Sequence, residues 1–264
     1  MASIIDWCQI RQNMLLYSQR IELYNPSYWD KEACTISDNM PHWAELTKKQ
    51  LRKLPLSKEL TLLDVGAGTG RMTLPMAKRV KHITALEPSE KMLAILKEKA
   101  LKQHIFNIYY VNKSLEDLDS STQYDLVVAS FSLFMFDIKA ALLKMDALAN
   151  KGVFLFLSAS PWIDESIQKA VYGSSSRWSD FIFIYNILYE AGIFANVEIC
   201  DFTVKQSYMD FEDATSKFMQ ICRIPQEKKT QLAEYLRKHL VEEKGKLWST
   251  RKKKAAALWW TKTQ

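Results

Sequence analysis

Three glycines follow an acidic strand end in the stretch LLDVGAGTG, where Asp64 closes an apolar run and Gly66, Gly68 and Gly70 come behind it. Glycine accepts positive φ angles and lets a backbone pass close to a ligand, so this turn is predicted to approach a bound small molecule. A dinucleotide site would carry G-x-G-x-x-G, whereas Arg71 stands at the third glycine position. An aspartate two residues before Gly66 suits an ammonium group better than a pyrophosphate.

A second acid, Glu87, lies 21 residues after Gly66, at the end of the next apolar run. A carboxylate at the tip of a strand can accept hydrogen bonds from both hydroxyls of a ribose, and charged acceptors make the stronger hydrogen bonds. Pro88 and Ser89 follow it and are expected to shape the floor beneath an adenine ring. The alternative for Glu87 is a solvated acid at a strand end.

Along the sequence, apolar runs alternate with helical patterns, and the strands and helices that they predict must position these residues. Amphipathic helices are predicted at about 71–80, 90–102 and 138–149. The strands predicted between them are Thr61–Val65, Ile83–Glu87, Ile108–Val111, Tyr124–Ala129 and Val153–Ser158. Apolar strands separated by amphipathic helices indicate βαβ units and a parallel sheet buried on both faces. The predicted fold class is therefore α/β, with a doubly wound, mostly parallel, seven-stranded sheet and helices on both faces.

The chain on either side of this region divides into further segments. Residues 1–55 are predicted to form an N-terminal helical cap, interrupted by an Asn-Pro turn in NPSYW, and residues 56–210 to form the core with a sixth strand in NVEICDFTV. Two helical patterns in residues 211–243 are expected to cover the acceptor site as an insertion. Residues 244–264 carry a basic segment and the last strand, which is expected to complete the core sheet.

The motifs together resemble those of the class I (Rossmann-like) S-adenosylmethionine-dependent methyltransferases, small-molecule type. LLDVGAGTG is followed in family order and spacing by ALEPS (85–89), SLEDL (114–118), YDLVVAS (124–130) and a strand led by Gly152. The resemblance covers roughly residues 25–200. It implies an enzyme of the methyltransferase class that uses S-adenosylmethionine as its cofactor.

The resemblance also implies how the cofactor binds. The glycine turn would pass under the methionine part, Glu87 would hold the ribose, the backbone carbonyl of Ser130 would meet the methionine amino group, and an aromatic N-terminal segment would fold over the cofactor. The residues expected to bind the cofactor are Asp64, Gly66, Ala67, Gly68, Gly70, Glu87, Pro88, Ser114, Leu115, Ser130, Tyr28 and Trp29.

At the adenine edge the chain departs from many relatives, which carry Asp and a small residue just before EDL. Ser114 and Leu115 stand there, and Glu116 is a competing candidate for contact with the adenine. The serine hydroxyl can meet the adenine amino group, and the backbone N–H of Leu115 can donate to a ring nitrogen.

Composition narrows the remaining choices. The chain has 264 residues, a net charge of +6 and a pI of about 9.0, which favours acidic partners. Its four cysteines, including Cys34, are scattered and lack zinc-ligand spacing, so we expect no metal site and a reducing, cytoplasmic location. No apolar segment reaches the roughly 18 residues that a membrane span requires, and a signal peptide is not expected.

The acceptor and the catalytic residue are less well specified. Displacement at a sulfonium needs positioning and desolvation more than a fixed base, so no catalytic residue is assigned, and His42 is a candidate base with a structural role as its alternative. Tyr24, Tyr28 and Trp162 are candidates to line the acceptor pocket. The sequence favours a small acceptor, and its basic character allows an anionic one.

Two alternatives to a small-molecule enzyme stay open. The basic run at 244–254 would serve an RNA methyltransferase as a phosphate-binding patch, although lysines also protect exposed sheet edges. A cofactor-binding protein that has lost its chemistry is the other alternative. Nucleic acid is the less favoured partner because no separate RNA-binding module is visible, and the oligomeric state is left open.

Overall fold

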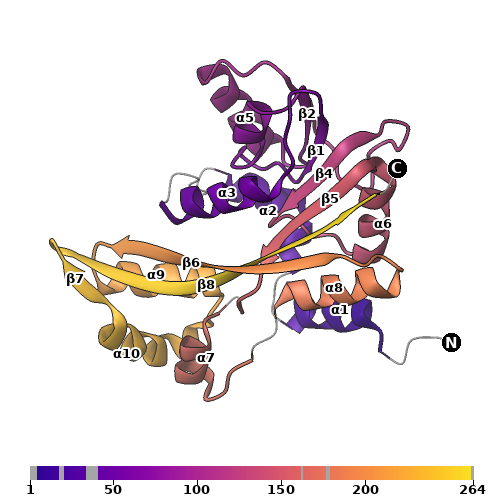
Figure 1. The fold of residues 1–264 in the computed structure, drawn as a ribbon. Coiled ribbons are helices and arrows are strands. Elements are labelled where there is room, and N and C mark those ends of the chain that lie inside the picture. Colours follow the sequence, from indigo (N-terminus) through magenta and orange to yellow (C-terminus); the bar gives the residue numbers. More distant parts are fainter. Residues whose placement is uncertain (1–4, 18–20, 34–40, 162, 177–178, 263–264) are drawn as a thin grey trace. The chain divides into compact units, whose positions relative to one another are not determined.

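The computed structural model describes residues 5–17, 21–33, 41–161, 163–176 and 179–262. Eight strands formed by these residues make one sheet in the order β3-β2-β1-β4-β5-β8-β6, with β7 paired to β8 (Figure 1). The strands are β1 Thr61–Val65, β2 His82–Leu86, β3 Ile108–Val111, β4 Tyr124–Ser130, β5 Ala149–Ser158, β6 Asn196–Tyr208, β7 Val241–Glu243 and β8 Lys246–Thr261. This sheet confirms the predicted α/β class.

The strand pairing places a ligand site at one edge of the sheet. β1 pairs in parallel with β2 and with β4, while β2 pairs with β3 and β4 with β5, again in parallel. The strand order reverses between β1 and β4, and ligands of doubly wound sheets bind at the carboxyl ends of the strands beside such a reversal. Asp64 in β1 stands opposite Ala85 of β2 and Val128 of β4, one residue from that edge.

Helices precede the first strand, connect the strands and lie between β6 and β7 in the sequence. They are α1 Trp7–Tyr17, η1 Ile21–Tyr24, α2 Pro26–Glu32, α3 Pro41–Lys53, α4 Thr73–Ala77, α5 Glu90–Lys102, α6 Ile138–Leu148, α7 Glu165–Tyr172, α8 Asp180–Glu190, α9 Phe211–Cys222, η2 Gln226–Lys228 and α10 Lys229–His239. Several of them begin at side-chain caps that the sequence supplies. Ser89 accepts from the Met92 amide at the start of α5, and Asp137 accepts from the Ala140 amide at the start of α6.

The core explains why the central strands are nearly continuous apolar runs. Leu62, Ile83, Leu126 and Val128 are at most 1% exposed and belong to one cluster with the inward side of α5. Burial on both faces of the sheet removes the usual alternation of polar and apolar residues. A glycine is needed at position 152 of β5 for a different reason, because a Cβ there would lie 2.8 Å from the Trp260 carbonyl oxygen of β8.

The chain divides into two compact units. Unit 1 comprises Met1–Leu157, Phe183–Glu198 and Ala256–Gln264, and unit 2 comprises Ser158–Ile182 and Ile199–Ala255. Unit 2 has an apolar cluster of its own, in which Ile167, Phe218 and Leu232 bring together α7, α9 and α10. The chain passes between the units several times, so neither unit is one continuous segment.

The structure differs from the sequence predictions at three places. NPSYW does interrupt the N-terminal helices, between η1 and α2, but only at Asn25: Asn25 accepts from the Ser27 amide and Pro26 occupies the first turn, so the rest of the segment is helical. Residues 165–172, for which no element was predicted, form α7 and end at Gly173 with φ +76°. An eighth strand, β7, also appears in the described chain, because Lys244 and Gly245 both take positive φ and close a tight hairpin with β8.

Within the described residues, no helix combines the length and the apolar character that crossing a membrane would require. Cys34 and Trp162, which the sequence analysis considered, lie outside the described residues.

Candidate functional site

The glycine turn is fixed to the end of the neighbouring strand. The amides of Gly66 and Ala67 both donate to the Leu86 carbonyl oxygen, over 2.8 and 3.0 Å. Gly66 has φ +71°, and a Cβ there would lie 2.4 Å from the Cβ of Ser132. Gly70 has φ +95°, and a Cβ there would lie 2.4 Å from Leu96 of α5. Both glycines are therefore required by packing inside the protein.

Gly68 differs from its two neighbours because its open side is not filled by protein. It has φ +54°, and the nearest atom to an added Cβ is the Met92 sulfur, 3.9 Å away. Its amide donates to Glu87 Oε2 over 2.8 Å, and the Ser89 amide donates to Glu87 Oε1 over 2.9 Å. Glu87 is 5% exposed. Burial raises the pKa of its carboxyl, and the two amides partly oppose that rise.

Asp64 lies deeper in the same floor, where it is 1% exposed. Its Oδ2 accepts a 2.6 Å hydrogen bond from the Thr73 hydroxyl. Burial raises the pKa of Asp64 to about 6, against the lowering effects of Thr73 and the Arg71 guanidinium. The negative charge of Asp64 is therefore costly without a ligand, and a cation bound nearby would stabilise it.

The loop after β4 forms a second wall of the site. Phe131 has φ +55°, a strained backbone conformation for an aromatic residue, and its amide donates to the Phe156 carbonyl oxygen over 2.8 Å. The Ser132 hydroxyl donates to the Val65 carbonyl oxygen over 2.5 Å. These bonds hold the loop against the glycine turn, and such strain at a strand end is typical of functional sites.

The N-terminal helices contact this loop through buried hydrogen bonds and ring packing. Arg11 of α1 is 1% exposed and donates to the carbonyl oxygens of Leu133 and Met135 over 2.7 and 3.4 Å. The Trp29 ring packs on Phe134 with centroids 5.3 Å apart, and the Trp29 indole N–H donates to the Leu23 carbonyl oxygen over 2.9 Å. Residues far apart in sequence thus form one aromatic wall.

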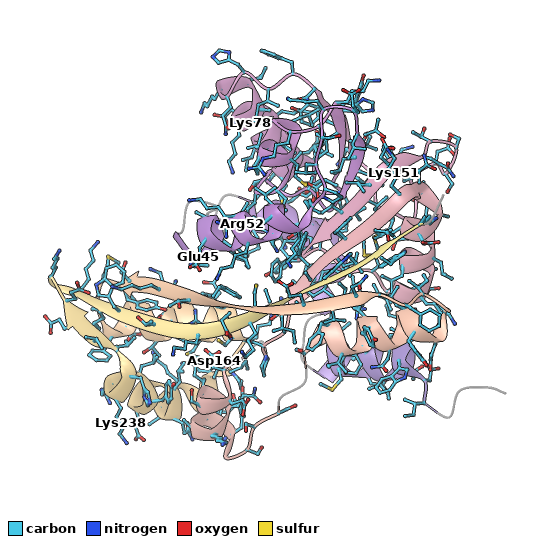
Figure 2. All side chains as sticks on the ribbon, viewed as in Figure 1. Glu45, Arg52, Lys78, Lys151, Asp164 and Lys238 are labelled. Carbon is cyan, nitrogen blue, oxygen red and sulfur yellow. The ribbon has the colours of Figure 1, made fainter. Side chains whose placement is uncertain are left out.

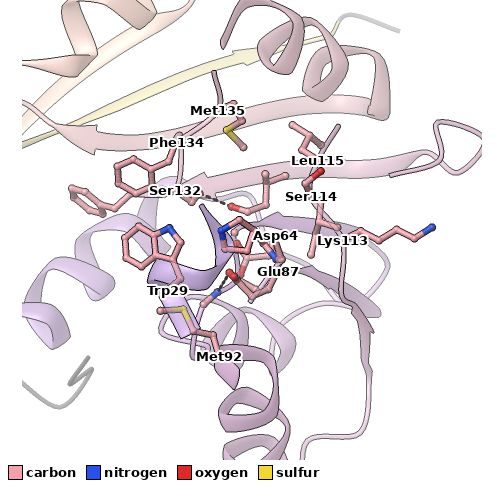
Figure 3. A pocket seen from close by; sticks show the side chains of 18 of the residues that line it. Trp29, Asp64, Glu87, Met92, Lys113, Ser114, Leu115, Ser132, Phe134 and Met135 are labelled. Atoms are coloured by element: carbon pink, nitrogen blue, oxygen red, sulfur yellow. Dashed lines mark hydrogen bonds between the residues drawn. The ribbon is translucent and has the colours of Figure 1, made fainter. Parts of the chain in front are cut away.

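These parts enclose a cavity of about 480 Å³, all of whose lining residues belong to unit 1. Figure 3 shows Asp64 and Glu87 at its centre, with Trp29 and Phe134 to one side and Ser114 and Leu115 to the other. The cavity is lined by ten of the twelve residues expected to bind the cofactor, namely Asp64, Gly66, Ala67, Gly68, Glu87, Pro88, Ser114, Leu115, Ser130 and Trp29.

The other expected residues take different places. Gly70 packs against α5 behind the turn. Tyr28 stands edge-on to Trp29, with ring centroids 5.1 Å apart, and Tyr24 lines the cavity. His42 is 8% exposed and stacks beside Trp43, with centroids 5.2 Å apart, and it is not among the residues that line the cavity.

Two serines that were expected to meet the ligand also make contacts within the protein. The Ser114 hydroxyl donates to Asp117 Oδ2 over 2.7 Å, so it closes a local turn. The Ser130 hydroxyl accepts from Arg71 over 2.6 Å. Leu115 is buried, at 3% exposure, and offers an apolar surface to the cavity.

Sequence reasoning expected Trp29 at the site but did not find its partners in the aromatic wall. Phe131, Phe134 and Phe136 follow the end of β4 and line the cavity. The usable signal was position, because these residues come directly after a predicted strand whose carboxyl end faces the ligand. Arg71 was noted only as a replaced glycine, although it too lines the cavity.

Three of the six basic residues in the run at 244–254 form ion pairs within unit 2. Arg251 and Lys253 both pair with Asp164, which is labelled in Figure 2, and Lys254 pairs with Asp201 over 2.6 Å. Lys253 is only 12% exposed at its side chain. These contacts indicate that much of the run stabilises unit 2 itself.

The comparisons with known proteins agree with this geometry. Residues 62–152 match the sequence model of a family described as a methyltransferase domain. An uncharacterized protein of Haemophilus influenzae is 28% identical over 200 residues, which are 75% of this chain and 74% of that protein.

Solved structures share the fold. A proposed methyltransferase of Bacillus halodurans matches with a TM-score of 0.56 and 18% identity, over 83% of this chain and 99% of that one. A precorrin-6y C5,15-methyltransferase of Geobacter metallireducens matches with a TM-score of 0.51 and 16% identity, over 86% of this chain and 92% of that one.

Proposed function

We propose that this chain, whose residues 62–152 match a methyltransferase domain, is a class I S-adenosylmethionine-dependent methyltransferase that transfers the methyl group to a small acceptor by in-line displacement. One observation carries the choice of a small acceptor. Apolar side chains from η1, α2 and the loop after β4 line the cavity together with the glycine turn, and such an apolar lining around a concave site is typical of small-molecule sites.

We propose the following placement of the cofactor. The ribose hydroxyls donate to Glu87, whose two oxygens keep lone pairs beyond those used by Gly68 and Ser89. The adenine lies between Pro88 and Leu115, and the methionine part crosses the open side of Gly68. Phe134 and Trp29, which line the same cavity, would then flank the space beside the sulfonium methyl group.

The chain's own residues perform the reaction mainly by positioning and by excluding water. The aromatic wall desolvates the acceptor and holds it in line with the carbon–sulfur bond that breaks. When bound, S-adenosylmethionine would supply an electrophilic methyl group, which a lone pair of the acceptor would displace from sulfur to leave the neutral thioether S-adenosylhomocysteine. Any acceptor proton leaves to solvent or to a nearby base, for which His42 is not well placed because it does not line the cavity.

A transfer experiment tests the acceptor class. S-adenosylmethionine with a labelled methyl group is incubated with the protein and, separately, with total RNA or with a metabolite extract below about 1 kDa. We expect label in the metabolite fraction and none in RNA. Methyl transfer to RNA in the absence of transfer to metabolites would contradict the proposal.

A charge variant supplies the control. Lys252→Gln combined with Lys254→Gln removes two exposed cations of the basic run. A small-molecule enzyme should keep its turnover, with a modest and salt-dependent change in KM. An RNA enzyme that uses this run should bind its acceptor much more weakly, with a shallower dependence of affinity on salt.

A further inference from the structure

A second, shallow groove lies at the amino ends of the first three strands of unit 1. Its lining residues include Lys58, Lys78, His104, Ile105, Phe106 and Asn107. Lys58 precedes β1, Lys78 follows α4 and precedes β2, and residues 104–107 precede β3. Because β1, β2 and β3 run parallel, these segments meet at the edge of the sheet opposite to the carboxyl ends that carry Asp64 and Glu87.

Hydrogen bonds between the segments hold the groove in shape. The Lys58 ammonium donates to the Lys78 carbonyl oxygen over 2.8 Å, and the Lys78 ammonium donates to Gln103 Oε1 over 2.8 Å (Figure 2 labels Lys78). The Asn107 side-chain amide donates to the Ala77 carbonyl oxygen over 2.9 Å. An ammonium group has three N–H donors, so both lysines keep donors for a ligand.

The positive charge at this groove is not neutralised by carboxylates. Four exposed cations line the groove or flank it in sequence, namely Lys58, Lys78, Arg79 and Lys81. Within the described residues none of the four forms an ion pair, and the neighbouring acid Glu59 is itself exposed and pairs with none of them. Lys253 and Lys254 of the run at 244–254, in contrast, do form ion pairs. Unpaired cations gathered at one edge attract a polyanion such as a phosphate backbone.

Exposed aromatic rings accompany these cations. Phe106, which lines the groove, is 76% exposed, and Tyr109 of β3 is 62% exposed. The His104 ring lies 6.4 Å from that of Phe106, and the His82 ring stands edge-on to that of Tyr109 at 5.3 Å. Proteins that bind single-stranded nucleic acid combine basic grooves for the phosphates with aromatic rings on which the bases stack.

We propose that this groove binds single-stranded nucleic acid, with a base stacked on Phe106 and backbone phosphates at Lys58 and Lys78. A small nucleotide fits less well, because small-molecule sites enclose most of their ligand and this groove is open. An acidic peptide would satisfy the lysines, but its carboxylates offer no planar ring to stack on Phe106.

This surface goes beyond the proposed function and is separate from the cofactor cavity. The two share no lining residue. β1 runs from one to the other, and its five residues separate them by roughly 13 Å. A strand in the groove is therefore a binding partner, while the small acceptor remains the proposed substrate.

Fluorescence anisotropy with labelled oligouridylate RNA and oligothymidylate DNA of about 12 nucleotides tests the proposal, and the two probes distinguish RNA from DNA. We expect binding that weakens as salt rises. Phe106→Ala should weaken binding at least fivefold with little change in the salt dependence, because it removes stacking and leaves the phosphate contacts. Lys58→Gln combined with Lys78→Gln should make the salt slope shallower by about 1.4, which is roughly 0.7 for each lost phosphate contact.

Lys252→Gln combined with Lys254→Gln is the matched control, since it removes the same charge from the run at 244–254. It should bind the oligonucleotides nearly as the wild type does, and a glutamate peptide of equal charge should bind much more weakly than they do. The proposal is wrong if neither oligonucleotide binds or if Phe106→Ala binds as tightly as the wild type. Peptide binding as tight as that of the oligonucleotides, or an equal loss in the control variant, would also overturn it.

S-adenosylhomocysteine separates this proposal from the proposed function. The variants at Lys58, Lys78 and Phe106 should bind it as the wild type does, which also shows that they are folded. If S-adenosylhomocysteine binds and no oligonucleotide does, only the groove proposal fails. If an oligonucleotide binds at the groove and S-adenosylhomocysteine does not bind, the proposed cofactor site fails and the groove proposal stands.

Discussion

At the scale of single residues, Asp64 combines a stability cost with a place in the ligand site. Its carboxyl is 1% exposed and retains one short hydrogen bond to Thr73. A negative charge in such surroundings is unfavourable for folding unless a ligand compensates it. The same feature that weakens the empty protein thus prepares the cavity for a cation.

Asp64→Asn should reveal this cost as a function of pH. Burial raises the pKa of Asp64 from 3.8 to about 6 in the folded state. Between these values the folded protein holds more protons than the unfolded chain, so the contribution of Asp64 to stability falls as pH rises through this window. The variant should therefore gain up to about 3 kcal/mol over the wild type between pH 4 and pH 7.5. Denaturant unfolding at several pH values measures the difference, and a gain that does not vary with pH would contradict the account.

Two glycines of the turn should respond differently to alanine. Both have positive φ, which costs an alanine about 1–2 kcal/mol. Gly66→Ala also forces its Cβ to within 2.4 Å of Ser132, so it should lose several kcal/mol of stability, while Gly68→Ala meets nothing closer than 3.9 Å. Thermal melts should rank Gly66→Ala well below Gly68→Ala. Equal stability of the two variants would show that the turn does not pack as described.

Much of this residue pattern could be predicted from sequence, because the glycine turn and Glu87 depend on local spacing. The roles of Arg11 and Phe131 could not. Arg11 binds carbonyl oxygens more than 120 residues away in sequence, and Phe131 lines the cavity from a strained backbone conformation. Neither the long-range contact nor the positive φ of an aromatic residue leaves a recognisable sequence signal.

At the scale of elements, α2 is attached to α5 beside the cavity. Ser89, the N-cap of α5, donates its hydroxyl to Asp30 Oδ1 over 2.6 Å, and the Lys91 amide donates to the same oxygen over 3.2 Å. These bonds lower the pKa of Asp30. Trp29, the neighbour of Asp30, packs on Phe134 from the loop after β4. α2 therefore contacts both sides of the cavity and can hold a bound ligand in place.

Asp30→Ala should loosen α2 without unfolding the core. The Ser89 cap remains, since its oxygen still accepts from the Met92 amide. We expect faster hydrogen exchange in residues 26–32, a small change in melting temperature and weaker cofactor binding. Ser89→Ala is the contrasting variant, because it removes the cap as well and should cost about 1 kcal/mol of stability. Unchanged exchange in α2 after Asp30→Ala would show that this contact does not hold the helix.

The elements themselves were mostly predictable. Thr61–Val65, Ile108–Val111 and the helix at 90–102 have the bounds that the sequence predicted, because apolar runs and a serine cap define them. β8 begins at Lys246 and so includes most of the basic segment that was expected beside the last strand, since paired charges such as Lys254 and Asp201 allow a polar segment to form a strand. Whether such a polar segment forms a strand depends on its contacts with the neighbouring strand, and these contacts cannot be recognised in a single sequence.

At the scale of the whole molecule, the cavity belongs to unit 1 alone, while α9 and α10 belong to unit 2. The expectation that residues 211–243 cover the acceptor stays a prediction. Hydrogen exchange can test it in two steps. S-adenosylhomocysteine alone should protect the lining segments of unit 1 and leave α9 and α10 unchanged, and addition of the acceptor should then protect residues 211–243. No acceptor-dependent protection there would remove these helices from the site.

Calorimetric titration of S-adenosylhomocysteine and NAD tests the central claim most directly, because it asks which nucleoside the cavity was built to hold. The wild type should bind S-adenosylhomocysteine and not NAD. Glu87→Ala removes the proposed acceptor of two ribose hydrogen bonds, each expected to contribute roughly 1.5–3 kcal/mol, so the affinity should fall at least tenfold. Glu90→Ala, an exposed acid three residues further on, should bind as the wild type does. Binding of NAD without S-adenosylhomocysteine, or an unchanged dissociation constant in Glu87→Ala, would contradict the account.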